Sequence, residues 1–583
     1  MSNNDNFLVF IILSVAILLG FHYFYEAPRQ ERERAVISAQ QAPKMALPQA
    51  KPAAVNALLS PRGDVLAQNA RLPVSSPVLR GSINLVGGRV DDLILSSYRE
   101  TLAPDSPSIT LLSPTGSAPP HAAYYAEFGW MAAQEGTSVP GPQSVWRTDA
   151  SALEAGGRPV LLRWDNGAGL VFEREISLDE HYMLTVTDRV RNAGIAAVNL
   201  YPYALVARHG TPVLQGAGAP LHEGAVGVFE TRLEEHPYDK LADEGTVAGQ
   251  AQQGSWLGFT DKYWLVALVP SLPDGAHLPV RFTHSKTQDA RKDLYQADWR
   301  AEGVSVAPGA VSAPVTARLF AGPKQVDLLD AYEKSLNIRH FDLAIDFGWF
   351  YFLTKPFFYA LDFLGRWSGN FGVGILILTI CLRLLLFPLA DKSYRSMEQM
   401  KALQPEIARL QERFGQDRVR LNQEMMELYK RERVNPLSGC LPIVIQIPIF
   451  FALYKVLFVS LEMRHAPFFG WIRDLSAADP TTIFNLFGLI PWQPPSFLMF
   501  GVWPLLMGAT MYAQQLMAPQ APDPIQRKVF MFLPLFFTVL LAPMAAGLVI
   551  YWTWSNILSL GQQWVIHRRM AGLRERLANK KAS

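Results

Sequence analysis

Cysteine and charge are both scarce in this chain of 583 residues. Its two cysteines, Cys381 and Cys440, lie in or beside apolar runs of the C-terminal third, and the long polar middle has none. A disulfide framework or a cysteine-rich metal site is therefore excluded there. Charged residues make up 18% of the chain and apolar residues 49%, a low charged fraction for a soluble protein. The net charge of +2 gives no bulk excess that would indicate a nucleic-acid partner.

Motifs of the common catalytic classes are also missing. The sequence contains no G-x-x-x-x-G-K-[ST] phosphate loop, no H-E-x-x-H zinc pair and no G-x-S-x-G nucleophile elbow. The histidines are scattered. An envelope enzyme acting on sugars is conceivable from residues such as Glu173, Glu175 and His181, but they form no specific constellation. We expect a protein that is not an enzyme and that has no catalytic residues, cofactor or metal site.

What the chain does have is long apolar runs. The first, FLVFIILSVAILLGFHYFY, extends from Phe7 to Tyr25, and about 20 helical residues cover a bilayer core of about 30 Å. A cleavable signal peptide is the alternative, but the run has neither a basic leading region nor a small-x-small cleavage site. We expect an uncleaved transmembrane anchor at 1–25. A linker rich in Ala, Gln and Pro follows over 26–60 and is predicted to be flexible.

Residues 61–330 have a different pattern. Short alternating runs such as YMLTVTDRVRNAG are separated by Gly, Pro, Asn and Asp, which predicts a large all-β sandwich. RNAG at 191–194 favours the tip of a β-hairpin. The region 331–370 is then dense in aromatic residues, which favours an interfacial helix on a membrane surface. An ordinary helix that closes the β domain is the alternative.

Five further apolar segments lie within 371–566. With the anchor they predict a polytopic α-helical membrane protein of six transmembrane helices, with a large β-sandwich domain after the first. The last two segments are separated by the sequence APMAAG. The five predicted spans are 371–390, 441–461, 497–517, 529–542 and 545–566.

Lysine and arginine in the loops predict the orientation, because cytoplasmic loops carry the excess of both. The segment 391–438 contains ten basic residues and the tail 567–583 contains six, whereas the loop 464–496 contains two. The first two segments are therefore predicted to be cytoplasmic, and the loop and the β domain to be outside. Both termini of the chain are then cytoplasmic.

A single arginine interrupts the second predicted span. Arg383 is the only charge between Phe371 and Ala390, and such a charge costs about 2.5–3.5 kcal/mol at the centre of a helix in lipid. Thr379 lies four residues earlier, on the same helix face. Further polar residues are predicted in the cytoplasmic halves of other spans, whereas the outer halves are mostly apolar. These residues are Gln446, Gln514 and the series Asn556, Ser559 and Gln563, which repeats every three or four positions.

We interpret this one-sided distribution as a hydrated pocket that is sunk into the bilayer, open to the cytoplasm and closed towards the outside. Water there would surround the charge of Arg383. The simpler alternative is that the long side chain of Arg383 extends to the membrane interface. The agreement of four spans favours the pocket.

The cytoplasmic segment 391–438 has apolar positions at steps of three and four, on both sides of FGQD. This pattern predicts two antiparallel helices, a helical hairpin. Its methionines either provide an adaptable surface for partners or fill the seam of the hairpin. They are Met397, Met400, Met425 and Met426.

The sequence QEMMELYKRERVNPLSGCLPIVIQIPIFFALYKVL (423–457) resembles the signature of the YidC/Oxa/Alb family of membrane protein insertases. TICLRLLLFPL, HAPFFGWIRDLSAADP and GLVIYWTWSN are similar to the same family, in the same order. The resemblance is strong over 371–566. The β domain after the first span resembles the layout of the Gram-negative members, in which that domain is periplasmic.

The resemblance implies five transmembrane helices around a groove that is open to the cytoplasm and the lipid of the bacterial inner membrane. It assigns the groove charge to Arg383, and groove contacts to Thr379, Gln446, Tyr551 and Trp552. It further implies that nascent membrane proteins are the substrates and that ribosomes and the Sec translocon are partners. A solute transporter or channel is the alternative function, but the chain shows neither polar groups in both leaflets nor repeated halves.

Overall fold

The computed structural model describes most of the chain from Leu59 onward. The anchor predicted at 1–25, and all but the last two residues of the linker predicted at 26–60, lie outside the described residues. The chain divides into two compact units, and along the described sequence the boundary between them falls between Asp346 and Phe347. The described ranges are 59–212, 221–287, 293–414, 417–432, 434, 441–488, 490, 492, 494–495, 500–517 and 524–582.

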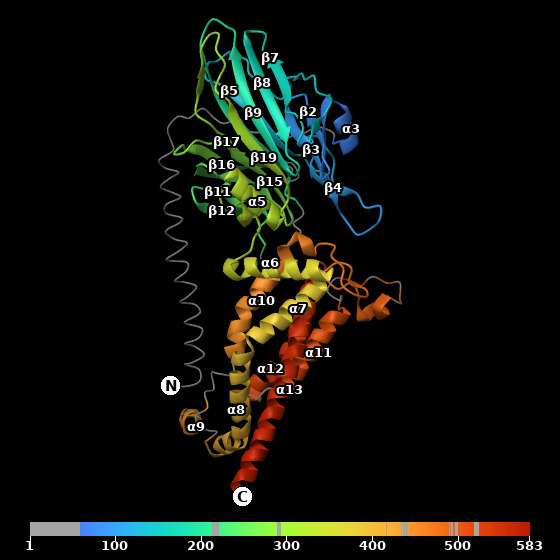
Figure 1. Ribbon diagram of the computed structural model, residues 1–583, viewed down its shortest axis with the longest axis vertical. Coiled ribbons are helices and arrows are strands. Elements are labelled where there is room, and N and C mark those ends of the chain that lie inside the picture. Colours follow the sequence, from blue (N-terminus) through green and yellow to red (C-terminus); the bar gives the residue numbers. More distant parts are fainter. Residues whose placement is uncertain are drawn as a thin grey trace. The chain divides into compact units, whose positions relative to one another are not determined.

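The first unit contains two antiparallel-rich β-sheets (Figure 1). The larger has the order β13-β16-β17-β10-β5-β3-β2-β1-β6, with β18 beside β10 and β4 beside β3. Its strands are β1 (Arg71–Ser75), β2 (Leu79–Asn84), β3 (Arg89–Arg99), β4 (Ser108–Leu112), β5 (Tyr124–Ala132), β6 (Leu153–Glu154), β10 (Val198–His209), β13 (Thr246–Ala251), β16 (Leu278–Ser285), β17 (Leu294–Arg300) and β18 (Val304–Val306).

The smaller sheet has the order β12-β11-β14-β15-β19-β9-β8-β7. In β8 buried and half-buried residues alternate along LVFEREISL, the pattern of a strand with one face against a core. The β-rich sandwich predicted from the sequence is thus present. The strands of this sheet are β7 (Val160–Asp165), β8 (Leu170–Leu178), β9 (Met183–Asn192), β11 (Gly224–Phe229), β12 (Arg232–Pro237), β14 (Trp256–Thr260), β15 (Trp264–Pro270) and β19 (Val315–Pro323).

A buried arginine joins the two sheets. Arg174 on β8 has no exposed surface, and its Nε and Nη2 atoms donate to the two carboxylate oxygens of Asp188 on β9, both at 2.8 Å. The same guanidinium donates to the backbone carbonyls of Gly88 and Phe128, at 3.2 and 2.7 Å. Because Phe128 lies on β5 of the larger sheet, one side chain ties both layers of the sandwich together.

The β-hairpin predicted at 191–194 is wrong. Strand β9 ends at Asn192 and pairs with β8 and β19 in the smaller sheet, whereas β10 pairs with β5, β17 and β18 in the larger one. RNAG therefore begins a crossing between sheets. The Asn192 side chain supports this crossing, since its amide donates to the backbone oxygens of Ala196 and Val306, at 2.8 and 2.9 Å.

The segment predicted as an interfacial region, 331–370, is divided between the two units. In the first unit α5 (Val326–Leu336) is followed by the 3-10 turn η3 (Phe341–Ala344). In the second, α6 (Tyr351–Ser368) buries Phe358 and Leu361. Its opposite side exposes Phe352, Phe363 and Trp367 by 68, 67 and 72%, as a membrane-surface helix would. Two short helices of the first unit are α3 (Arg62–Ala67) and α4 (Tyr238–Glu244).

The described part of the second unit is helical. Its remaining elements are α7 (Phe371–Leu385), α8 (Phe387–Phe414), α9 (Arg418–Arg431), α10 (Leu441–Val459), η5 (Leu461–Met463), η6 (Ile483–Gly488), α11 (Val502–Met517), α12 (Pro524–Leu541) and α13 (Ala546–Ala582). Within the described residues, no single helix has both the length and the hydropathy of a membrane span. Helix α7 and the start of α8 reach that length and hydropathy only together, as one bent pair.

The span predicted at 371–390 is broken rather than continuous. Helix α7 ends at Leu385, α8 begins at Phe387, and the two are inclined by 63° (Figure 1). Pro388 has no N–H to donate to the carbonyl of Leu384, so an unbroken helix would leave that carbonyl unsatisfied. The amide of Leu386 turns back to the carbonyls of Leu382 and Leu384 instead.

Helices α8 and α9 pack on each other and are joined by an ion pair of 3.2 Å between Glu406 and Arg431. The first arm of the predicted hairpin thus begins inside the region predicted as a span. At the other end, the predicted span 545–566 and tail 567–583 share one helix, because α13 continues to Ala582.

Candidate groove site on helix α13

Arg383 lies in the last turn of α7 and faces α13. The Asn370 side chain caps the start of α7 by accepting from the amide of Val373 at 3.1 Å. At the other end, the half-buried Arg383 donates from Nη2 to the hydroxyl of Ser555. Its backbone oxygen accepts from the side-chain Nε2 of Gln562 at 3.4 Å. Helix α13 therefore contacts both the side chain and the main chain of Arg383.

Gln446 and Tyr551 form a second contact to α13. The amide Nε2 of Gln446 on α10 donates to the Tyr551 hydroxyl at 2.7 Å. The next residue, Trp552, packs its ring against Phe450 of α10 and Phe537 of α12, with centroids 4.7 and 5.7 Å away. The predicted groove residues Gln446, Tyr551 and Trp552 thus lie together where three helices meet.

A third contact joins α11 to α13. The side chain of Gln514 donates to the backbone oxygen of Asn556 at 3.3 Å. The Asn556 side chain donates in turn to the hydroxyl of Thr510 at 3.1 Å. The polar side chains of α13 thus make hydrogen bonds to α7, α10 and α11, three different neighbours.

The other predicted groove residues make local bonds or none. The hydroxyl of Thr379 is buried and donates to Ile375 O of its own helix at 2.6 Å. Ser559 is also buried and donates to Ser555 O at 2.9 Å. Gln563 is half-buried and makes no hydrogen bond within the described residues. The grouping of these three with Arg383 stays a prediction.

Sequence reasoning missed Ser555 and Gln562, which touch Arg383. Both were within reach of the same pattern. The series 555, 559 and 562 repeats at steps of four and three. It shares Ser559 with the predicted series 556, 559 and 563, and its other two positions each lie one residue earlier. A choice between two such faces requires the packing partner of the helix, which periodicity does not supply.

The hairpin methionines are only partly described. Met400 and Met425 are half-buried, and Met426 is 50% exposed. The side chain of Met397 lies outside the described residues. The two readings of these methionines, a partner surface or a filled hairpin seam, stay predictions.

The acids considered for sugar chemistry are engaged on the surface of the smaller sheet. Glu173 accepts from Arg163 at 3.1 Å, and Glu175 lies 3.7 Å from Arg189. His181 is exposed in a turn. Nothing in this arrangement brings the three side chains to one substrate.

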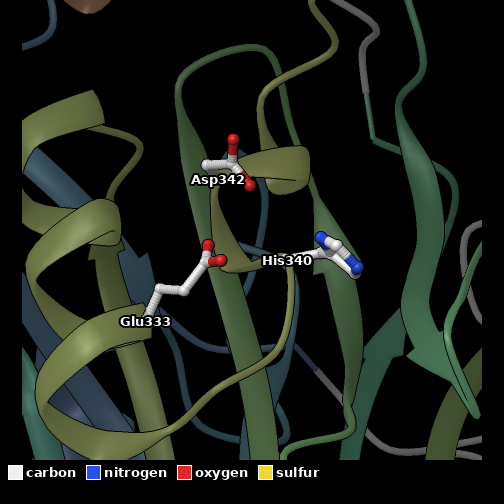
Figure 2. Close-up of side chains that lie close together, drawn as sticks. All are labelled: Glu333, His340 and Asp342. Atoms are coloured by element: carbon white, nitrogen blue, oxygen red, sulfur yellow. The ribbon is translucent and has the colours of Figure 1, made fainter.

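Three side chains with metal-ligand chemistry lie close together in the first unit (Figure 2). Ligand atoms of Glu333, His340 and Asp342 are within 4.8 Å of one another. The Glu333 carboxylate already accepts from the amide of Phe341 at 3.1 Å, which caps η3. Burial, and then the charge of Asp342, raises the pKa of Glu333. Capping accounts for the position of Glu333, and we assign no metal to the cluster.

Comparisons with known proteins match both units. A family model described as the 60Kd inner membrane protein covers residues 363–574, and one described as the YidC periplasmic domain covers residues 71–360. These two descriptions together place the chain in a class of inner-membrane proteins that carry a periplasmic domain.

Full-length relatives define the class further. A protein of Methylobacterium radiotolerans named membrane protein insertase YidC is 48% identical, covering 97% of this chain and 95% of the relative. One of Nitrobacter hamburgensis with the same name is 46% identical, covering 100% and 98%. The chain belongs to the YidC family of membrane protein insertases, and its function is that of an insertase. These relatives give the alternative of a solute transporter or channel no support.

Among solved structures, a YidC insertase crystal structure with the first transmembrane domain resolved is 16% identical to this chain. It aligns with a TM-score of 0.35 over 84% of this chain and 91% of the solved one.

Proposed function

We propose that the chain inserts nascent membrane proteins through a hydrated groove at Arg383, open to the cytoplasm and to lipid. An acidic segment of the substrate enters the groove from the inner side and is attracted by the guanidinium. Apolar parts of the substrate leave sideways into lipid, and their partitioning drives release. No bond is made or broken, and no nucleotide is required.

The observation that carries this proposal is the contact of Arg383 with α13. Arg383 is half-buried and hydrogen-bonded to Ser555 rather than to a carboxylate. The contact with Ser555 therefore supplies no negative charge that would neutralise Arg383. A guanidinium held by a neutral hydroxyl keeps its charge available for a carboxylate that arrives.

The strength of that attraction follows from Coulomb's law. Two unit charges 4 Å apart attract by about 1 kcal/mol in water and about 4 kcal/mol at an effective dielectric constant near 20. A half-buried arginine lies between these limits. Since about 1.4 kcal/mol is a tenfold change, loss of the charge should slow insertion of an acidic substrate by at least about fivefold.

The orientation and the partners belong to the same proposal. The six spans predicted from the sequence place both termini and the α8–α9 hairpin in the cytoplasm, with the β-sandwich in the periplasm. The basic residues near the C-terminus favour contact with ribosomes. Cooperation with the Sec translocon is expected from the family resemblance. Lipid at the open side of the groove receives the inserted segment.

Reconstituted vesicles test the electrostatic step. Two substrates differ only in the outer segment, which is acidic in one and uncharged in the other. Arg383→Gln and Arg383→Glu should slow the acidic substrate at least about fivefold and leave the uncharged one within twofold, whereas Arg383→Lys should retain activity. Arg366→Gln on α6, an exposed arginine paired with Asp362, is the matched control. Full-rate insertion of the acidic substrate by Arg383→Glu would refute the step.

A further inference from the structure

The carbonyl of Arg383 lies next to the break between α7 and α8 and accepts a hydrogen bond from a side chain of α13. In a continuous helix the carbonyl of Arg383 would accept from the amide four residues later. The residue four positions later is Phe387, where α8 begins in a new direction. The carbonyl of Arg383 accepts from the side chain of Gln562 at 3.4 Å. A partly buried carbonyl without any donor would destabilise the bent arrangement.

The amide of Gln562 is itself only half satisfied. Its Oε1 is buried and has no hydrogen-bond partner within the described part of the chain. An unpaired buried amide oxygen is destabilising, and an apolar side chain of similar length would avoid that penalty. The bond from Nε2 to the main chain of Arg383 is what the glutamine provides in return.

Ser555 acts at the other end of the same residue. It is 4% exposed, and its hydroxyl accepts from the guanidinium of Arg383. Positions 555 and 562 are seven residues apart, two turns along one face of α13. Two residues on one face of α13 thus reach the two ends of Arg383: Ser555 contacts the guanidinium and Gln562 contacts the main-chain oxygen.

We infer that Ser555 and Gln562 are positioning residues, which hold Arg383 by its guanidinium and by its main chain and so fix where the positive charge stands. This inference rests on the proposed function, in which that charge attracts acidic substrates. Gln562 stabilises the break that turns the end of α7 towards α13, and Ser555 orients the charged group. Neither residue needs to touch the substrate.

A functional cycle of variants separates positioning from a general loss of structure. Ser555→Ala and Gln562→Met should each lower insertion of the acidic substrate about threefold to tenfold, the range expected for one lost hydrogen bond. The uncharged substrate should change by less than twofold. In an Arg383→Ala background neither substitution should have any further effect, because no charge remains to be placed. Gln515→Met on α11, a half-buried glutamine without a hydrogen bond to the described residues, is the control.

Equal losses on both substrates, or the same loss with and without Arg383, would overturn the inference. A measurement that needs no substrate separates its failure from that of the proposed function. Spin labels at positions 373 and 392, in a chain with Cys381→Ala and Cys440→Ala, report a distance between α7 and α8 that depends on the angle between the two helices. Gln562→Met should broaden or shift the distribution of this distance, and Gln515→Met should not. An unchanged distance overturns the role of Gln562 even if Arg383 proves essential, whereas a changed distance supports it even if Arg383→Ala inserts both substrates normally.

Discussion

Replacing Arg174 with methionine is expected to destabilise the β-sandwich by about 3–5 kcal/mol, because the carboxylate of Asp188 would stay buried without its cation. The structure makes this a demanding position. The guanidinium has no exposed surface and makes four hydrogen bonds, two to Asp188 and two to backbone carbonyls. It also lies over the ring of Trp146, at 4.8 Å from the centroid.

Urea unfolding of residues 43–346, followed by tryptophan fluorescence, measures the effect. Arg163→Met on the neighbouring strand is the matched control, since its ion pair with Glu173 has a 58% exposed arginine side chain and should contribute only about 0–1 kcal/mol. The double variant Arg174→Met with Asp188→Leu should recover most of the loss, because no charge is left unpaired. Equal destabilisation by the two arginine variants, or no recovery in the double variant, would refute the reasoning.

Two further predictions concern protonation and close packing. Burial lowers the pKa of His209 and His222 to about 4 each, so their contribution to stability is fully present above pH 6.5. As the pH falls from 6.5 to 4, each histidine should lower the free energy of unfolding by about 3 kcal/mol. Urea unfolding at several pH values measures this dependence; His209→Asn should reduce it, and an unchanged dependence in that variant would contradict the prediction. A Cβ at Gly508 would lie 2.2 Å from the Thr538 hydroxyl, whereas one at Gly561 meets nothing within 4 Å. Gly508→Ala should therefore lower the melting temperature of the detergent-purified chain and Gly561→Ala should not; equal melting temperatures would show that α11 and α12 separate freely.

Hydropathy and alternation predicted the β-rich first unit and the helical second one, because both patterns reflect burial within single elements. They did not predict that the chain crosses from the smaller sheet to the larger one at RNAG. A hairpin and a crossing between sheets begin with the same turn residues, and the choice depends on pairing with β5 and β17, which are far away in the sequence.

The break after Leu385 was missed for a related reason. The apolar run continues through Pro388, and hydropathy does not register helix direction. At the site, periodicity pointed to a polar face on α13 and included Asn556, which forms hydrogen bonds with Gln514 and Thr510 of α11. It could not recognise Gln562, because the partner of this residue is the main-chain carbonyl of Arg383, next to a helix break that hydrophobic periodicity does not register.

Helix α13 runs without interruption from Ala546 to Ala582, about 55 Å at 1.5 Å per residue. A stiff rod of this length has no joint in which a twist applied at its basic end could be absorbed. A partner that gripped the tail and rolled it by a fraction of a turn would roll Ser555 and Gln562 with it. Rotation of the basic tail by such a partner would therefore change the position of the positive charge of Arg383.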